Sequence, residues 1–421
     1  MWLRKLGPGL VTGASDDDPS GIATYSQAGA QFGYGLLWTQ LFSLPLMAAI
    51  QEISARIGRV TGRGIAGNIR KTYSKWILYP IVLLVVVANT INLGADIGAV
   101  GDAVHLLVGG PALVYAALFA LLSLGMECFL CYRNYAGYLK WLTIVLFAYV
   151  AAVFFAHVSW RAAVHATLVP HLSFSRDYLA TFIAVLGTTI SPYLFFWQAS
   201  METEDIRISP KDEPLKKELR QGKPGKVRGS LNRIRWDTYV GMTFANLVSY
   251  CIILTAAATL YAHGIRDVQS SQEAAKALEP IAGKGAFILF ALGIIGTGLL
   301  AVPVLAGSAA YAVGEALQWP TGLDRKPLDA KGFYGVVAVA TVIGLAINFG
   351  RWIDPIKALF WSAVINGVVA VPVMVIVMRM VGRRDVMGEF SRVSKILRAV
   401  GWLATAVMAA AAIGLFATWK Q

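Results

Sequence analysis

Residues 12–21 read TGASDDDPSG and interrupt an apolar segment at about 8–33 that is otherwise long enough to cross a membrane. Pro19 removes a backbone hydrogen-bond donor, and each of the three adjacent carboxylates is costly at mid-membrane unless it is paired. Non-helical backbone at that depth occurs only where it lines a cavity or is buried in protein. The sequence therefore predicts a broken helix here, with a candidate site at the break.

The composition places this stretch in a membrane protein. Of the 421 residues, 57% are hydrophobic and 14% are charged, whereas globular chains average roughly 45–50% and about 25%. At roughly 20 residues per helix, the apolar residues suffice for about ten to twelve spans. Continuous apolar runs, such as 81–88 and 287–305, exclude alternating barrel strands. We therefore expect an all-α polytopic membrane protein that lies in a lipid bilayer and binds no nucleic acid.

Apolar runs between charge clusters predict eleven transmembrane helices in a single transporter domain that covers 1–421. The expected spans lie at about 8–33, 36–58, 77–107, 112–132, 137–159, 178–201, 237–262, 284–313, 333–350, 354–380 and 395–418. With the N-terminus in the cytoplasm, 29 of the 37 Lys and Arg residues fall on the cytoplasmic side. This bias predicts an inner (plasma) membrane protein with a cytoplasmic N-terminus and an extracytoplasmic C-terminus.

A second interruption occurs in the sixth predicted span, where residues 187–193 read GTTISPY. The first and sixth spans open two five-span halves, at about 8–159 and 178–380, and the eleventh span at 395–418 is left over. Proline kinks are common in membrane helices, but matched breaks in two halves indicate an inverted-repeat transporter with its site at the midplane. Free carbonyls at the breaks, together with the charge of Asp18, favour a cation.

The sequence also resembles the Nramp family of divalent-metal transporters, which has the LeuT-like fold, over nearly its whole length. The resemblance is carried by GPG at 7–9, DPSG at 18–21, QAGAQFGY at 27–34, LLW at 36–38, ARIG at 55–58 and VTG at 60–62. The family signature in the first span is Asp-Pro-Gly-Asn, of which Asp18 and Pro19 match. The signature in the sixth span is Met-Pro-His, of which only Pro192 matches.

The departures from these signatures resemble the divergent Nramp-related magnesium transporters. Ser191 replaces the methionine whose soft thioether favours transition metals, and Gly21 replaces an asparagine ligand and widens the cavity. A wider, oxygen-lined pocket suits Mg²⁺, which dehydrates reluctantly. The resemblance therefore implies transport of Mg²⁺, and also of Mn²⁺, into the cytoplasm by alternating access. It implies Asp18 as the principal ligand, in a site lined by Ser15, Gly21, Thr188 and Ser191.

Further polar residues are candidates for the ion pathway. Asp96 either faces the pathway or bonds to a neighbouring helix, and Asn366 matches a polar position of the family's tenth span. Asp17 is expected to face the aqueous vestibule and attract cations. The family's sixth-span histidines correspond to Tyr193 and Gln198, which do not exchange protons near neutral pH. We therefore expect transport without obligatory proton coupling, with Tyr193 in the pathway.

Two alternatives stay open within the transporter class. One is a proton-coupled Mn²⁺ or Fe²⁺ symporter of the Nramp type, and the other is a LeuT-fold transporter of an organic substrate. The chain contains no HExxH, GxSxG or P-loop motif, so we do not expect an enzyme. We expect a monomer that has no cofactor other than the metal ion it transports.

Overall fold

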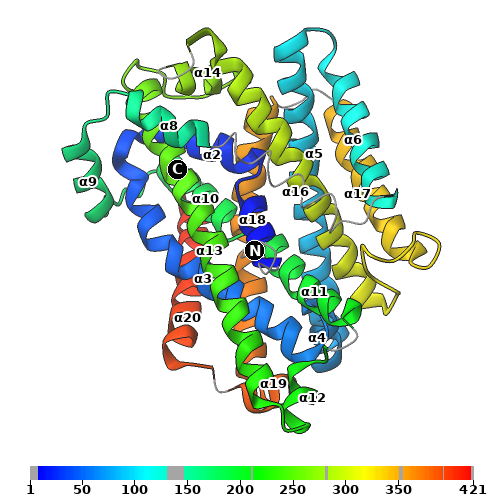
Figure 1. The fold of residues 1–421 in the computed structure, drawn as a ribbon. Helices are drawn as coiled ribbons and strands as arrows, with labels where there is room; N and C mark the ends of the chain where they lie inside the picture. The colour runs from blue at the N-terminus through cyan, green and yellow to red at the C-terminus, as the bar shows by residue number, and fades with distance from the viewer. Residues whose placement is uncertain are drawn as a thin grey trace.

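The computed structural model describes residues 8–129, 147–209, 212–279, 283–349, 354–391 and 393–418, all of whose regular elements are helices (Figure 1). Nine continuous helical segments within these ranges are long and apolar enough to cross a membrane. Their exposed side chains include many large apolar groups, such as Trp76, Leu83 and Leu121, which face outward as they do in a bilayer. The expected all-α membrane architecture is confirmed.

The first break lies where the sequence predicts it. Helix α1 (Pro8–Asp16) ends before Asp18, and α2 (Pro19–Phe32) begins directly after it. Asp18 adopts the extended conformation of an N-cap residue, and Pro19 occupies the first helical turn, where its missing N–H is of no consequence. Local chemistry therefore both ends the first half-helix and starts the second.

The second break repeats this pattern. Helix α10 (Arg176–Thr189) ends at the GTTISPY stretch, and α11 (Pro192–Ile208) starts with a proline in its first turn. Ser191 is the N-cap residue and has an extended backbone. Both predicted interruptions are confirmed as pairs of half-helices.

The other long helices fall on the remaining predicted spans. They are α3 (Leu37–Thr61), α5 (Lys75–Val108), α6 (Ala112–Phe129), α8 (Phe147–Phe155), α13 (Pro224–Ala256, continued by η3, Ala257–Tyr261), α16 (Ala286–Leu317), α17 (Lys331–Phe349), α18 (Pro355–Gly382) and α20 (Lys395–Thr418). Short helices connect them: η1 (Gly33–Leu36), α4 (Ile65–Thr72), α9 (Trp160–Leu168), α12 (Leu215–Arg220), α14 (Ser271–Ala275), η4 (Lys276–Leu278), η5 (Gly283–Gly285), α19 (Arg384–Met387) and η6 (Gly388–Ser391). Residues 137–146 of the predicted fifth span lie outside the described residues.

Two helices extend further than their apolar segments. The structure continues α11 to Ile208 and starts α13 at Pro224, whereas hydropathy predicts a helix end near 201 and a start near 237. Hydropathy marks the part of a helix that is in the bilayer, and these helices project beyond it. An ion pair between Glu202 and Arg233, with 2.5 Å between the carboxylate and guanidinium atoms, joins the projecting ends.

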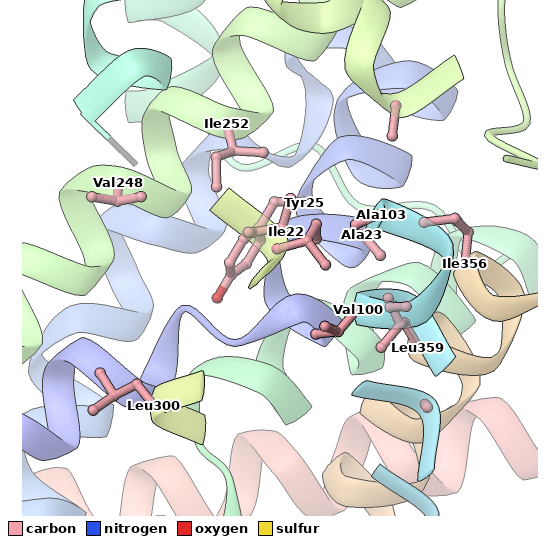
Figure 2. Packing of buried hydrophobic residues seen from close by; sticks show 14 of the residues in the cluster. Ile22, Ala23, Tyr25, Val100, Ala103, Val248, Ile252, Leu300, Ile356 and Leu359 are labelled. Carbon is pink, nitrogen blue, oxygen red and sulfur yellow. The ribbon is translucent and has the colours of Figure 1, made fainter. Parts of the chain in front are cut away.

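The half-helix α2 packs against five long helices, α5, α10, α13, α16 and α18. Figure 2 shows part of the apolar packing around it. Ile22 and Tyr25 of α2 are fully buried. The same buried apolar cluster contains Val100 and Ala103 of α5, Val248 and Ile252 of α13, Leu300 of α16, and Ile356 and Leu359 of α18. The break between α1 and α2 is therefore held inside the bundle, away from lipid.

Glycines let the other half-helices approach their neighbours closely. A Cβ atom on Gly13 of α1 would lie 2.3 Å from the carbonyl oxygen of Gly241 in α13. A Cβ atom on Gly187 of α10 would lie 2.1 Å from the carbonyl oxygen of Ala363 in α18. Such backbone-to-backbone packing through small residues is typical of membrane helices.

The substitution Gly187→Ala is expected to destabilise the protein, because the added methyl group forces α10 and α18 apart. The expected loss is about 1–3 kcal/mol, measured as a lower melting temperature of the purified protein in detergent. Gly335→Ala is the matched control, since a Cβ atom at Gly335 of α17 meets nothing within 4 Å. Equal melting temperatures for the two variants would contradict the close packing at Gly187.

Candidate functional site

Asp18 lies in the first break, and its side chain is buried, with 1% of its surface exposed. Its Oδ1 atom accepts hydrogen bonds from the Ser20 hydroxyl at 2.5 Å and from the Gly21 N–H at 2.8 Å. These are the bonds of a helix N-cap, and they satisfy donors that a membrane interior leaves without water. One oxygen of the carboxylate is thus committed to the start of α2.

The other oxygen of Asp18 faces two further helices. Its Oδ2 atom accepts from the Asn92 Nδ2 of α5 at 3.1 Å and lies 3.3 Å from the Tyr193 hydroxyl of α11. That hydroxyl is closer to the carbonyl oxygen of Ser15, at 2.9 Å. Because a hydroxyl carries one hydrogen, Tyr193 donates to one acceptor at a time. Asp18 Oδ2 therefore keeps lone pairs for a cation, and Tyr193 links the end of α1 to the site.

The end of α10 lies against the same region. The Ser191 hydroxyl donates to the carbonyl oxygens of Gly187 at 2.6 Å and Thr188 at 2.9 Å. A Cβ atom on Gly21 would lie 3.2 Å from Thr188 Oγ1 and 3.4 Å from the carbonyl oxygen of Asp16. The missing side chain of Gly21 therefore lets the carboxyl ends of α1 and α10 come together. The partial negative charge of two helix C-termini favours a cation between them.

The five residues predicted to line the metal site thus meet at the two breaks. Asp18, Ser15 and Gly21 come from the first break, and Thr188 and Ser191 come from the second. The donors they present are a carboxylate, hydroxyls and backbone carbonyls. All of these are oxygen atoms, which are the ligands that hard cations prefer.

Two of the predicted pathway residues, Asp96 and Asn366, lie beside different breaks. Asp96 of α5 is fully buried, close to the charge of Asp18 and to the backbone amide of Ser20, without the geometry of a formed hydrogen bond. Asn366 of α18 is buried beside Gly367, which packs on Gly187 of α10. Within the described residues, no hydrogen bond joins Asn366 to Asp18. Asp96 therefore lies beside the carboxylate, and Asn366 lies beside the second break.

Asp17 differs from its expected position. It was expected to face an aqueous vestibule, but its side chain is 0% exposed, and neither carboxylate oxygen has a hydrogen-bond partner in the part of the chain that the structure describes. The reason is the closure of the bundle, because α1 packs on α11, α13 and α16 and covers the break. The structure thus shows the site closed off from solvent at this residue.

Asn92 was not among the predicted site residues, although it contacts Asp18 directly. Its Oδ1 atom accepts a hydrogen bond of 2.6 Å from the Ser362 hydroxyl of α18, so its Nδ2 is turned toward Asp18. Asn92 lies four residues before Asp96, and this spacing puts both on one face of α5. That spacing was the available signal, because an amide and an acid on one face of an apolar helix mark the face that meets the site.

The site is not a cluster of acidic, histidine or cysteine side chains. Across the described ranges, no three such residues come together in a way that could hold a metal ion. The carboxylates of Asp16, Asp17 and Asp96 are close enough to interact with the charge of Asp18, but the four side chains do not converge on one point. Among these four buried carboxylates, Asp18 is the one whose printed contacts join both broken helices and α5.

Two broken helices that meet at a buried carboxylate inside a helical bundle define a membrane transporter of the LeuT-like class. The solved structure of MhsT in complex with L-phenylalanine shares this fold, with a TM-score of 0.64 at 12% identity over 99% of this chain and 98% of that one. The chain belongs to the Nramp family, since the family model described as "Natural resistance-associated macrophage protein-like" matches residues 9–418.

Individual relatives agree with this assignment. A protein of Ralstonia nicotianae, named divalent metal cation transporter MntH, is 28% identical over 441 residues, which cover 100% of this chain and 92% of the relative. A crystal structure of a manganese transporter from Eremococcus coleocola matches with a TM-score of 0.76 at 18% identity, over 99% of this chain and 87% of that one. These relatives are transporters, which confirms the expectation that the chain is not an enzyme.

Substitutions of Asp18 are expected to separate its role as a cap from its role as a charge. Asp18→Asn keeps an oxygen that accepts from Gly21, whereas Asp18→Ala loses it. Without metal, the alanine variant should therefore be less stable than the asparagine variant by about 1 kcal/mol. Thermal melting of the two purified proteins in metal-free buffer measures the difference. If both melted at the same temperature, the capping role of Asp18 would be wrong.

Proposed function

We propose that this protein transports divalent metal cations into the cytoplasm by alternating access about its two broken helices, with Mg²⁺ as the preferred ion and Mn²⁺ as a second substrate. Membership of the Nramp family supports the class of substrate, and so do the names of its relatives as divalent metal cation and manganese transporters. The buried carboxylate between two helix C-termini supports the position of the ion.

The donor set of the site is the observation that carries the preference for Mg²⁺. Only one oxygen of Asp18 is left for an ion, because the other caps α2. Ser191, at the position of the family's methionine, presents a hydroxyl. An ion bound here has few direct protein ligands, all of them oxygen, and completes its shell with water. Mg²⁺ suits such a site, since it usually keeps several waters and binds through one or two carboxylates.

Gln198 supports transport without obligatory proton coupling. Its Oε1 accepts from the Gln51 Nε2 at 2.5 Å, and its own Nε2 donates to the Thr238 hydroxyl at 2.9 Å. The Gln198 side chain thus accepts through its oxygen and donates through its nitrogen, and an amide does not bind a further proton near neutral pH. With Tyr193 at the other histidine position of the family, the sixth span offers no imidazole to relay a proton. The alternative remains a proton-coupled Mn²⁺ or Fe²⁺ symporter, and the name of the manganese transporter from Eremococcus coleocola favours Mn²⁺ as an ion.

The remaining parts of the proposal concern the pathway and the topology. We assign Asp96, Asp17, Tyr193 and Asn366 to the pathway, because all four are buried, Asp17 in the first break itself and the others on helices that pack beside the breaks. Spans one to five and six to ten form the two repeats, as the equivalent positions of the breaks suggest. The excess of Lys and Arg on one side places the N-terminus in the cytoplasm and the C-terminus outside.

Uptake of Mg²⁺, Mn²⁺ and Ca²⁺ into proteoliposomes is expected to identify the substrate. The wild type should take up Mg²⁺, with competition by Mn²⁺. Asp18→Asn should lose at least about tenfold of this uptake, because the charge that binds the ion is gone. Asp329→Asn removes a carboxylate at an exposed position and should transport like the wild type. Uptake of Mn²⁺ with no effect of Mg²⁺ would overturn the ion, and unchanged uptake by Asp18→Asn would overturn the site.

Proton movement is expected to be absent during Mg²⁺ uptake. A pH-sensitive dye inside the same proteoliposomes should show no acidification that follows the entry of Mg²⁺, because the sixth span carries no histidine relay. Empty liposomes give the baseline for proton leakage. Acidification in proportion to Mg²⁺ entry would instead support the proton-coupled alternative.

A further inference from the structure

A cavity that contains none of the predicted metal-site residues lies at the end of the bundle that carries α4, α12 and α19 (Figure 1). It has a volume of about 350 Å³ and is formed where α4 meets the ends of α11 and α16. Its charged lining residues are Arg63, Arg70, Lys71, Arg207 and Glu315. Four cationic side chains and one carboxylate therefore share one cavity.

The four cationic side chains outnumber the acidic groups near them. Within the described residues, none of them takes part in an ion pair closer than 4 Å. Arg70 donates to the carbonyl oxygen of Ala316 and, at 3.0 Å, to the side-chain oxygen of Gln318. Arg207 donates to a backbone carbonyl and also acts through its charge on the carboxylates of Glu204 and Glu315. The neutral acceptors orient the two guanidinium groups without removing the charge of Arg70.

The one carboxylate of the cavity is already engaged. Glu315 accepts from the Gly67 N–H at the start of α4 at 2.9 Å and from the Ser200 hydroxyl at 3.2 Å. It therefore occupies the amino end of α4 and stabilises the inner wall of the cavity. With its charge counted, the cavity still carries an excess of three positive charges.

The excess of positive charge makes the cavity unsuitable as a route for metal cations and suitable as a binding site for an anion. Lys216 of α12 lies near this cavity, since burial and then the charges of Lys71 and Arg220 lower its pKa, against an opposite effect of Asp385. Guanidinium groups match the oxygens of phosphate in pairs, and basic pockets at the cytoplasmic ends of membrane helices hold phosphate headgroups.

We propose that this cavity binds a phosphate group, from an anionic phospholipid or from free phosphate. Arg70 is half-buried, and Arg63, Lys71 and Arg207 are exposed at the cavity; Arg70 and Arg207 are oriented by their carbonyl acceptors. Because these residues come from α4 and α11, a bound phosphate ties the second broken helix to the frame around it. Binding therefore stabilises the arrangement of α11 and α4 that the structure shows. The proposal does not depend on which metal is transported.

Binding to the full-length protein in detergent tests this site. Native mass spectrometry compares phosphatidylglycerol with phosphatidylcholine, and thermal melting without lipid measures the effect of inorganic phosphate. The test variant carries Arg63→Gln and Lys71→Gln, which leave the hydrogen bonds of Arg70 and Arg207 in place. The control carries Arg228→Gln and Lys395→Gln, two exposed basic residues outside the cavity.

The expected result is binding that is about thirtyfold weaker in the test variant than in the control and the wild type, from the loss of two basic residues. Retention of phosphatidylglycerol identifies a lipid headgroup, and a higher melting temperature with phosphate identifies the free anion. Either result supports the site. Absence of both effects in the wild type, or an equal loss in the test and control variants, would overturn it.

Discussion

A carboxylate that caps a helix inside the membrane is the interaction on which this structure depends. Backbone donors in a bilayer have no water to bind, so a helix that starts at mid-membrane needs a cap from the protein. Asp18 provides that cap through one oxygen, which accepts from Ser20 and Gly21. The same side chain offers its other oxygen to the site. The start of α2 and the proposed ion site therefore share Asp18, and a substitution of this residue affects both.

The two breaks are alike in backbone and different in charge. Asp18 and Ser191 occupy equivalent positions before a proline that starts a half-helix, but only Asp18 carries a formal charge. The Ser191 hydroxyl turns back to the carbonyl ends of α10. The second break therefore adds no formal charge to the buried acids at and beside the first. It contributes the partial negative charge of a helix C-terminus instead.

Residues with a local signal were predictable from the sequence, and residues positioned by distant contacts were not. A proline and acids within an apolar run locate both breaks and Asp18, because the cost of burying them is a property of the segment itself. The burial of Asp17 depends on how α1 closes against three other helices. The length of α13 depends on polar contacts outside the bilayer, and a hydropathy pattern does not predict such contacts. The phosphate cavity joins residues of α4, α11 and α16 that are far apart in the chain.

Both halves of the first broken helix meet α13 backbone to backbone, at a glycine in each half. A Cβ atom would lie 2.3 Å from the carbonyl oxygen of Gly241 if placed on Gly13 of α1, and 2.4 Å from that of Ile253 if placed on Gly29 of α2. A glycine face has no side chain that must pass over a neighbour when two closely packed helices shift along each other. The contact with α13 is therefore the surface along which the first broken helix has the fewest side chains to displace when it moves.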